Sequence, residues 1–338
     1  MLRFPGKKVA FAALLLTAAG PLLADAAPFQ APAGITVPAT AKPFLNDPND
    51  FQFAIVGDRT GGHREGVFEQ AVRELNLLQP EFVITIGDQI EGYADDPAEI
   101  KRQWTEFEGL VNQLHMRYFY VVGNHDMSND TMRSEWLKQR GNDYYHFVYK
   151  NVLFIALNSE DPPNSEKKKE LFKSAGPEKT QLLMQLMQQK NNPDEAKKLI
   201  AQHPELMQMI EQFKNADRAT ISDRQVAYVK QALADNTDVR WTVLLMHKPV
   251  WRYKDVPQFG QIETLLAKRP YTMFAGHMHE YAYTKRNDRD YVQLGTTGGI
   301  AENGPAQDHI MWVTMTRDGP QIANIRLNGL FDKHGSQP

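Results

Sequence analysis

Short apolar runs alternate with amphipathic stretches along the first part of the chain. The runs at 51–56 (FQFAIV), 81–86 (EFVITI) and 117–122 (RYFYVV) are typical of buried strands. Between them, the segments 66–78 and 98–114 carry apolar residues at helical spacing. Because the strands are almost continuously apolar, this order predicts a sheet that helices cover on both faces.

The later part of the chain has a more antiparallel pattern. Segment 144–159 predicts two strands, and segment 311–327 predicts a hairpin that turns at Asp318-Gly319. Further apolar runs predict strands at 241–246, 271–275 and 291–295. The whole pattern therefore predicts an α/β fold.

One segment, 160–217, interrupts this pattern. It is rich in Lys, Gln, Met and Glu and lacks strand-like runs, which predicts two or three amphipathic helices inserted into the main domain. Such a helical insertion could pack on its host, close over a substrate or form a dimer contact. Just after it, Ser222 and Gln225 form a capping-box pattern that opens a helix at 222–235.

The N-terminal residues have the pattern of an export signal. A basic start precedes the apolar segment 9–24, and the small residues Ala24 and Ala26 suit cleavage by a signal peptidase. The apolar segment falls short of the ~20 residues that a membrane span needs. We therefore expect a signal peptide at 1–26, an extended lead-in at 27–50, and a periplasmic or secreted mature chain without a transmembrane anchor.

Composition narrows the class of partner. The 338 residues are 42% hydrophobic and 23% charged, as in globular proteins, and the net charge of −3 gives no electrostatic reason to expect a nucleic-acid partner. The chain has no cysteine, which excludes disulfides and thiolate metal sites. These features leave the oligomeric state unknown.

Polar residues of a few types follow the predicted strands. They are Gly57-Asp58, Gly87-Asp88, Gly123-Asn124-His125-Asp126, His247 and Gly276-His277-Met278-His279. Taken singly, a strand-end Asp is usually a turn residue and a lone His is usually structural. In α/β sheets, however, ligand sites gather beyond the carboxyl ends of the strands. The recurrence after five strands therefore predicts that these side chains converge on one site.

The chemistry of this set suits divalent metal ions. Carboxylate, amide and imidazole groups without sulfur favour Mn, Fe or Zn. Six protein ligands are more than one tetrahedral zinc ion can use. Two ions about 3.5–4 Å apart that share a carboxylate would use them all, and such a pair acts on phosphoryl groups.

The motifs also resemble those of a known family. GD (57–58), GDQ (87–89), GNHD (123–126), His247 and GHMH (276–279), in this order, look like the calcineurin-like metallophosphoesterase superfamily. The resemblance covers about residues 51–300 apart from the insertion. It implies a four-layer α/β/β/α sandwich over 51–330, with two sheets flanked by helices and a dinuclear metal centre.

The resemblance implies a role for each motif residue. Asp88 would bridge the two metal ions. The other implied ligands are Asp58 and His279 on one ion, and Asn124, His247 and His277 on the other. A metal-bound hydroxide would attack phosphorus, and His125, oriented by Asp126, would protonate the leaving alkoxide. Arg59 and Asn124 are the expected substrate contacts.

The first motif departs from the family pattern. Thr60 stands where the family commonly has a His, so the first ion would lose a nitrogen ligand. In the purple acid phosphatase branch, a Tyr three residues after the bridging Asp binds iron. That position is Glu91 here, with Tyr93 close by. Glu91 could supply an oxygen ligand or face solvent, and His63 could reach back to the ion.

Two further segments could contact the substrate. The GTTGG loop (295–299) has the glycine content to bring backbone N–H groups near an anion, although it could be only a tight connection. Trp251, Arg252 and Tyr253 follow His247 closely and could face the substrate.

The sequence thus favours an exported, metal-dependent phosphoesterase with a small phosphoester substrate. Whether it cleaves monoesters or diesters stays open. The alternative is a non-catalytic or single-metal relative that acts as a binding protein.

Overall fold

The computed structural model describes residues 29, 33–34, 36–163, 165–188, 193–216, 218–301, 307–330 and 332–334. The chain divides into two units, Met1–Leu45 and Asn46–Pro338. The predicted signal peptide lies outside the described residues. In the described part of the first unit, no residue is helical or in a strand, and the rings of Phe29 and Phe44 lie 5.3 Å apart.

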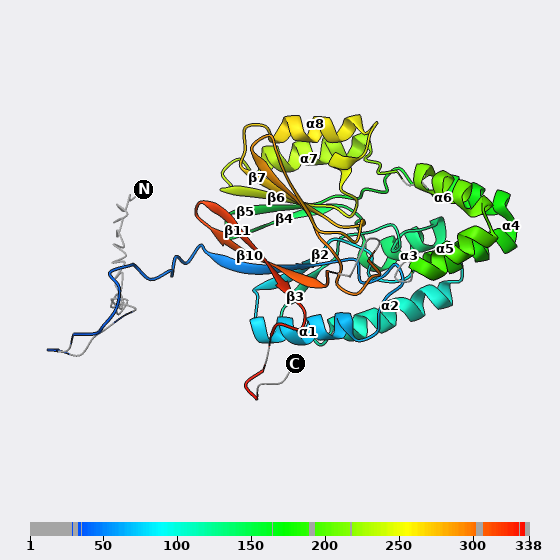
Figure 1. The fold of residues 1–338 in the computed structure, drawn as a ribbon. Helices are drawn as coiled ribbons and strands as arrows, with labels where there is room; N and C mark the ends of the chain where they lie inside the picture. The colour runs from blue at the N-terminus through cyan, green and yellow to red at the C-terminus, as the bar shows by residue number, and fades with distance from the viewer. Residues whose placement is uncertain are drawn as a thin grey trace, which may run out of the picture. The chain divides into compact units, whose positions relative to one another are not determined.

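The described part of the second unit contains two β-sheets, one above the other (Figure 1). The first sheet has the order β11-β10-β1-β2-β3, with bounds β1 Phe51–Val56, β2 Phe82–Thr85, β3 Arg117–Phe119, β10 His309–Thr316 and β11 Gly319–Arg326. The second has the order β4-β5-β6-β7-β9-β8, with bounds β4 Tyr145–Tyr149, β5 Val152–Ala156, β6 Trp241–Leu245, β7 Tyr271–Ala275, β8 Ala282–Arg286 and β9 Arg289–Gln293.

Each sheet contains a block of neighbouring parallel strands. β1, β2 and β3 run parallel in the first sheet, and β5, β6, β7 and β9 run parallel in the second. The outer strands β10, β11, β4 and β8 pair antiparallel with their neighbours. The carboxyl ends of the parallel strands therefore share one edge within each sheet, which is where the polar motifs lie.

Helices cover the outer faces of the sheets. Their bounds are α1 Val67–Leu78, α2 Pro97–Val111, α3 Asp130–Arg140, α7 Asp223–Asp235 and α8 Pro257–Leu266. One buried apolar cluster lies between the two sheets, a second joins the first sheet to α1, α2 and α3, and a third joins the second sheet to α7 and α8. This four-layer α/β/β/α arrangement confirms the predicted fold class (Figure 1).

Some elements were not predicted. The edge strand β8 (AYTKR) is mostly exposed, so it lacks the alternation that marks a half-buried strand. It turns into β9 through Asn287 and Asp288, whose φ angles are 54° and 56°. Asn and Asp tolerate this left-handed region, and paired positive φ angles are typical of a tight hairpin turn. Helices α3 and α8 were also missed.

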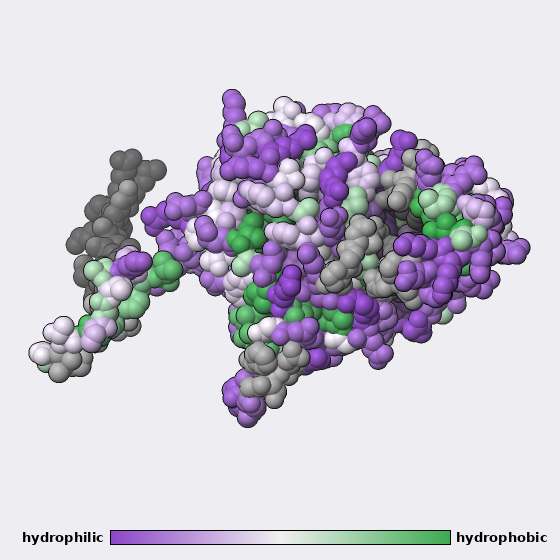
Figure 2. Space-filling view, viewed as in Figure 1, coloured by the Kyte–Doolittle hydropathy of each residue, from purple (hydrophilic) through white to green (hydrophobic). Residues whose placement is uncertain are grey.

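The insertion is helical, with α4 Ser165–Gln188, α5 Pro193–Gln202 and α6 Glu205–Ala216. Leu183, Leu186, Leu206 and Met209 form a small buried cluster of its own. The chain enters and leaves the insertion at one place, because Glu160 and Thr220 form a parallel β-bridge. On the face seen in Figure 2, hydrophobic residues gather over the insertion and also along the lower edge near α1. Among the described residues, no helix combines the length and the apolarity needed to cross a bilayer.

Candidate metal centre

The strand-end motifs meet where the two sheets face each other. Asp58 follows β1 and Asp88 follows β2, while His247 follows β6 of the other sheet. The ligand atoms form two groups, in each of which all atoms lie within 4.8 Å of one another. The groups are Asp58, Asp88 and His279, and Asp88, His247 and His277. Asp88 belongs to both groups, so the geometry divides the ligands as the family resemblance implies.

Short distances join the members of each group. His247 Nε2 lies 3.1 Å from Asp88 Oδ2, 3.1 Å from His277 Nδ1 and 3.0 Å from Asn124 Oδ1. His279 Nε2 lies 3.4 Å from Asp58 Oδ1. These oxygen and imidazole donors converge without sulfur and fit a pair of hard or borderline divalent ions.

Neighbouring groups orient the ligand side chains. The Nδ1 atoms of His247 and His279 face the backbone carbonyls of Ile86 and Ile300, which turns each Nε2 toward the carboxylates. Backbone N–H groups donate to both carboxylates: His125 N to Asp88 Oδ1 at 2.9 Å and His277 N to Asp58 Oδ1 at 2.9 Å. Such second-layer contacts fix the tautomer and rotamer of a metal ligand before the ion binds.

Several ligands adopt a backbone conformation that is rare for their residue type. The φ angles are 50° at Asp58, 56° at Asp88, 72° at His277 and 52° at His279. Positive φ in a non-glycine residue costs energy and clusters at functional sites. The surrounding contacts hold these residues in the strained conformation, which points their side chains toward one another.

Glycines in the motifs make room for the ligands. A Cβ atom at Gly276 would lie 2.0 Å from Asp58 Oδ2, and one at Gly123 would lie 2.2 Å from Asp88 Oδ1. A side chain at either position would therefore overlap a ligand carboxylate. Each of these glycines precedes one candidate ligand and leaves room for a candidate ligand that follows a different strand.

Electrostatics favours charged ligands. Burial opposes charge on Asp88, but His247 and His125 outweigh it and hold the Asp88 pKa well below its usual range. Burial likewise opposes charge on His247, yet Asp88 raises the His247 pKa to about 9. The pKa of His279 is raised despite burial because Asp58 lies beside it. A histidine must be neutral to coordinate an ion, so the binding of an ion here would displace these protons.

The prediction that Asp126 orients His125 is wrong. His125 Nδ1 lies 2.6 Å from the Glu91 carbonyl oxygen, which takes that orienting place. The buried Asp126 carboxylate instead accepts backbone N–H groups of Asp88 at 2.9 Å and Gly123 at 2.8 Å, so it ties two motif loops together. Burial, with the nearby Asp88, raises the pKa of Asp126 to about 7. His125 Nε2 lies 3.9 Å from Asp88 Oδ2, beside both groups.

The prediction that Arg59 contacts the substrate is also contradicted. Its side chain is buried and points into the layer between the first sheet and the helices. There the guanidinium donates to the Gln89 carbonyl at 3.1 Å, forms an ion pair with Glu106 and lies 5.6 Å from the centre of the Phe107 ring. Arg59 therefore supports the motif loops from behind. The other predicted substrate contact, Asn124, does face the ligand groups through Oδ1.

The structure places Glu91 and His63 outside both ligand groups. Glu91 accepts the backbone N–H of His63 at 2.7 Å and that of Gly62 at 3.3 Å. Burial raises its pKa, but Thr60 and these N–H groups outweigh the effect and lower it. The carboxylate thus holds the 60–63 loop, and among the described residues neither Glu91 nor His63 joins a ligand group. Thr60 itself is fully buried.

The GTTGG loop is a tight connection. Its N–H groups bond to the backbone of the first motif, Thr297 N to Gly57 O and Gly299 N to Asp58 O, each at 2.8 Å. Arg64 secures the same loop through the Gly299 carbonyl at 2.9 Å and an ion pair with Asp308. Of the two alternatives for this loop, anion contact and a tight connection, these contacts support the tight connection.

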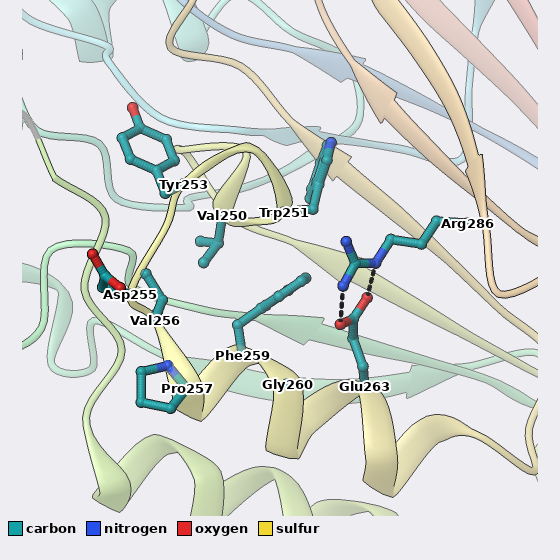
Figure 3. A pocket seen from close by; sticks show the side chains of 10 residues that line it. All are labelled: Val250, Trp251, Tyr253, Asp255, Val256, Pro257, Phe259, Gly260, Glu263 and Arg286. Atoms are coloured by element: carbon teal, nitrogen blue, oxygen red, sulfur yellow. Dashed lines mark hydrogen bonds and ion pairs between the residues drawn. The ribbon is translucent and has the colours of Figure 1, made fainter.

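Trp251 and Tyr253 line a different cavity, of about 600 Å³, between the short helix η1 (Val250–Arg252), α8 and Arg286 at the end of β8 (Figure 3). At one end Glu263 and Arg286 form a bidentate ion pair, in which Arg286 Nε donates to Glu263 Oε1 at 2.7 Å and Arg286 Nη2 donates to Glu263 Oε2 at 2.8 Å. None of the six predicted metal ligands lines this cavity. Arg252 donates to Gln293 at 2.8 Å.

No role was predicted for two residues that lie close to the candidate ligands, Tyr93 and Lys248. Tyr93 lies against Asn124 and His125, and in the sequence it is marked only by its nearness to Glu91. Lys248, which follows His247, is fully buried; it forms an ion pair with Glu160 and donates to the Arg218 carbonyl at 2.9 Å. Apart from the rarity of a buried Lys, no sequence signal marks this contact.

Comparisons with known proteins agree with this architecture. The human serine/threonine-protein phosphatase CPPED1 is 30% identical over 106 residues, which are 29% of this chain and 33% of that protein. The bovine protein of the same name is 31% identical over 100 residues, 27% of this chain and 31% of that protein. The matched region therefore spans about a third of the length of these curated relatives.

Solved structures share the fold. A dimetal phosphatase from Danio rerio has a TM-score of 0.52 at 13% identity, covering 82% of this chain and 99% of that one. GAP50, described as the anchor in the inner membrane complex of Plasmodium, has a TM-score of 0.52 at 13% identity, covering 83% and 85%. At this identity the likeness concerns the fold alone.

A family model gives the assignment. The model described as calcineurin-like phosphoesterase matches residues 50–281, which is more than half of the chain. This range contains both ligand groups and the motif around His125. The chain belongs to the calcineurin-like phosphoesterase family.

Proposed function

We propose that this protein hydrolyses phosphoric esters with the help of two divalent metal ions. The observation that carries the proposal is the pair of ligand groups that share Asp88. Asp58 and His279 would hold one ion with Asp88, and the remaining ligands would hold the other. These are Asn124, His247 and His277. Bound divalent ions supply Lewis acidity to phosphoryl oxygens and a strong nucleophile at neutral pH.

His125 is the proposed general acid. Its Nδ1 faces the Glu91 carbonyl, so the N–H on that nitrogen donates there and Nε2 is left to carry a proton to the leaving oxygen. Nε2 lies beside the shared carboxylate, at 3.9 Å, where a bound phosphoryl group would meet both ligand groups. A positioned acid of this kind contributes about 10²–10⁴-fold in rate.

Phosphomonoesters are the proposed substrate class. The human and bovine relatives and the Danio rerio structure are named as phosphatases, which supports monoesters over diesters. The oxygen and nitrogen donors exclude ions that need sulfur ligands and suit Mn, Fe and Zn alike. We also propose that the chain is exported, on the basis of the pattern in residues 1–26; N-terminal sequencing of the mature protein should begin near Ala27.

The experiment uses the mature protein, stripped with chelator and reloaded separately with Mn²⁺, Fe²⁺, Zn²⁺ or Mg²⁺. Hydrolysis of p-nitrophenyl phosphate and bis-p-nitrophenyl phosphate separates monoesterase from diesterase activity. Asp88→Ala should lose both bound metal and activity, whereas His125→Ala should keep the metal and lose about 10²–10⁴-fold in kcat. His115→Ala, which removes an exposed imidazole in the turn between α2 and β3, is the matched control.

Full activity in both Asp88→Ala and His125→Ala would overturn the proposal. Metal analysis adds an independent result, since the ligand groups call for two ions per chain. The fold by itself does not decide for catalysis, because the Plasmodium protein of equal TM-score is described as an anchor. Two bound ions without turnover of either ester would favour the alternative, a binding protein.

A further inference from the structure

The turn 91–93 is held tightly against the motif that carries Asn124 and His125. Tyr93 has a φ of 51°, a conformation that non-glycine residues seldom adopt. Its N–H donates to Ser128 Oγ at 2.8 Å, and the N–H of Gly92 donates to Gln103 Oε1 at 2.8 Å. A Cβ atom at Gly92 would lie 1.9 Å from the His125 carbonyl oxygen, so only glycine permits this approach. Strained backbone that the surroundings hold in place points to a functional role.

Tyr93 contacts the amide of Asn124. Asn124 Nδ2 donates to Tyr93 Oη at 3.3 Å, while Asn124 Oδ1 lies 3.0 Å from His247 Nε2. The two ends of an amide have nearly the same shape but opposite chemistry, and only the oxygen can bind a metal ion. By accepting a hydrogen bond from the nitrogen, Tyr93 selects the orientation that turns the oxygen toward the ligand group.

Tyr93 also contacts the imidazole of His125. The two rings meet edge to face, with centres 4.9 Å apart and an angle of 88° between their planes. The Glu91 carbonyl in the same turn accepts from His125 Nδ1 at 2.6 Å. The turn therefore restrains the imidazole on two sides and keeps its Nε2 toward Asp88.

We infer that Tyr93 is a positioning residue for the metal centre: its hydroxyl sets the amide of Asn124 and its ring sets the imidazole of His125. The part that concerns His125 rests on the proposed function, whereas the part that concerns Asn124 is a statement about metal binding. Tyr93 itself is 41% exposed, so its replacement leaves the core intact. A hydroxyl that orients a ligand affects affinity without touching the ion.

The test is calorimetric titration of chelator-stripped mature protein with Mn²⁺. Tyr93→Phe keeps the ring and removes the hydroxyl, so one of the two Mn²⁺ affinities should fall by about 10- to 100-fold while the other is unchanged. Tyr93→Leu also removes the ring and should in addition lower kcat for p-nitrophenyl phosphate with KM unchanged. Tyr283→Phe is the control, because Tyr283 is an exposed tyrosine on β8 whose hydroxyl donates to Asp290 at 2.8 Å.

Wild-type Mn²⁺ affinities in Tyr93→Phe overturn the inference, whatever the Tyr93→Leu variant does. Such a result leaves the proposed hydrolase untouched, because the wild-type activity is measured separately. Conversely, a wild-type protein that hydrolyses neither ester contradicts the proposed function, while a selective loss of one Mn²⁺ affinity in Tyr93→Phe still supports the role of Tyr93 toward Asn124.

Discussion

Replacing Lys248 by Met should destabilise the protein strongly. The Lys248 side chain is fully buried, its partner Glu160 is 8% exposed, and the ammonium also donates to the Arg218 carbonyl. The substitution keeps most of the volume but leaves a buried carboxylate without its cation. Breaking a buried ion pair from one side costs about 3–5 kcal/mol. For a domain of this size, at the lower end of about 2–4 °C per kcal/mol, the melting temperature should fall by about 6–10 °C.

The double variant Lys248→Met with Glu160→Met gives the sharper measurement. Replacing both members of a buried pair by apolar groups of similar volume is often neutral or stabilising, by about 1–4 kcal/mol. The double variant should therefore melt higher than Lys248→Met alone, so the two substitutions are far from additive. The assay is thermal unfolding followed by circular dichroism, with chelator present so that metal binding does not contribute.

Lys150→Met is the matched control. Lys150 also pairs with a glutamate, Glu81 at 3.0 Å, and also donates to a backbone carbonyl, that of Asp50 at 3.3 Å. Its side chain is 32% exposed, and a pair at the surface is worth only about 0–1 kcal/mol. If Lys248→Met and Lys150→Met lowered the melting temperature equally, the reasoning from burial would be refuted.

Three further results are expected. Gly123→Ala should abolish Mn²⁺ binding by displacing the Asp88 carboxylate, while Gly109→Ala, where a Cβ meets nothing within 4 Å, should leave binding intact; calorimetry checks both. Mn²⁺ at about 100 times the Kd of each site should stabilise the protein by about 2.7 kcal/mol per occupied site in a thermal scan, and chelator should reverse this. Arg140→Met should cost about 1–2 kcal/mol in denaturant unfolding, because its guanidinium lies 3.8 Å above the centre of the Trp104 ring, without change in Mn²⁺ binding.

The convergence of the candidate ligands could be predicted from the sequence because the strand ends carry a physical signature. At such a strand end, a buried apolar run stops at a glycine followed by a ligand. The glycine is required by close approach, as at Gly123 and Gly276, and the candidate ligand then meets ligands from the other strand ends. The close approach restricts one position to glycine, and the ligand restricts the next position to a few residue types, so the pattern can be recognised in the sequence alone.

Side-chain direction leaves no such trace, and there the sequence-based predictions failed. Arg59 is next to Asp58 in the chain, yet its guanidinium points into the helical layer beside Phe107, while the Asp58 carboxylate faces His279. Asp126 is next to His125, but its carboxylate is taken by backbone N–H groups. The carbonyl that orients His125 comes from Glu91, and any residue type supplies a carbonyl.

The insertion leaves and rejoins the sandwich at one spot. Thr220 N donates to the Ser159 carbonyl at 2.9 Å, and Thr220 Oγ1 donates to that of Pro162 at 2.7 Å, so the two stems run side by side. Because the two stems pair in parallel, a crossover link of roughly a dozen residues, rather than a tight turn, would be needed to replace α4, α5 and α6 without moving β5 or α7. A change confined to this segment would therefore alter the surface that the three helices present, while the strands β1, β2, β6 and β7 that precede the candidate ligands stay unchanged.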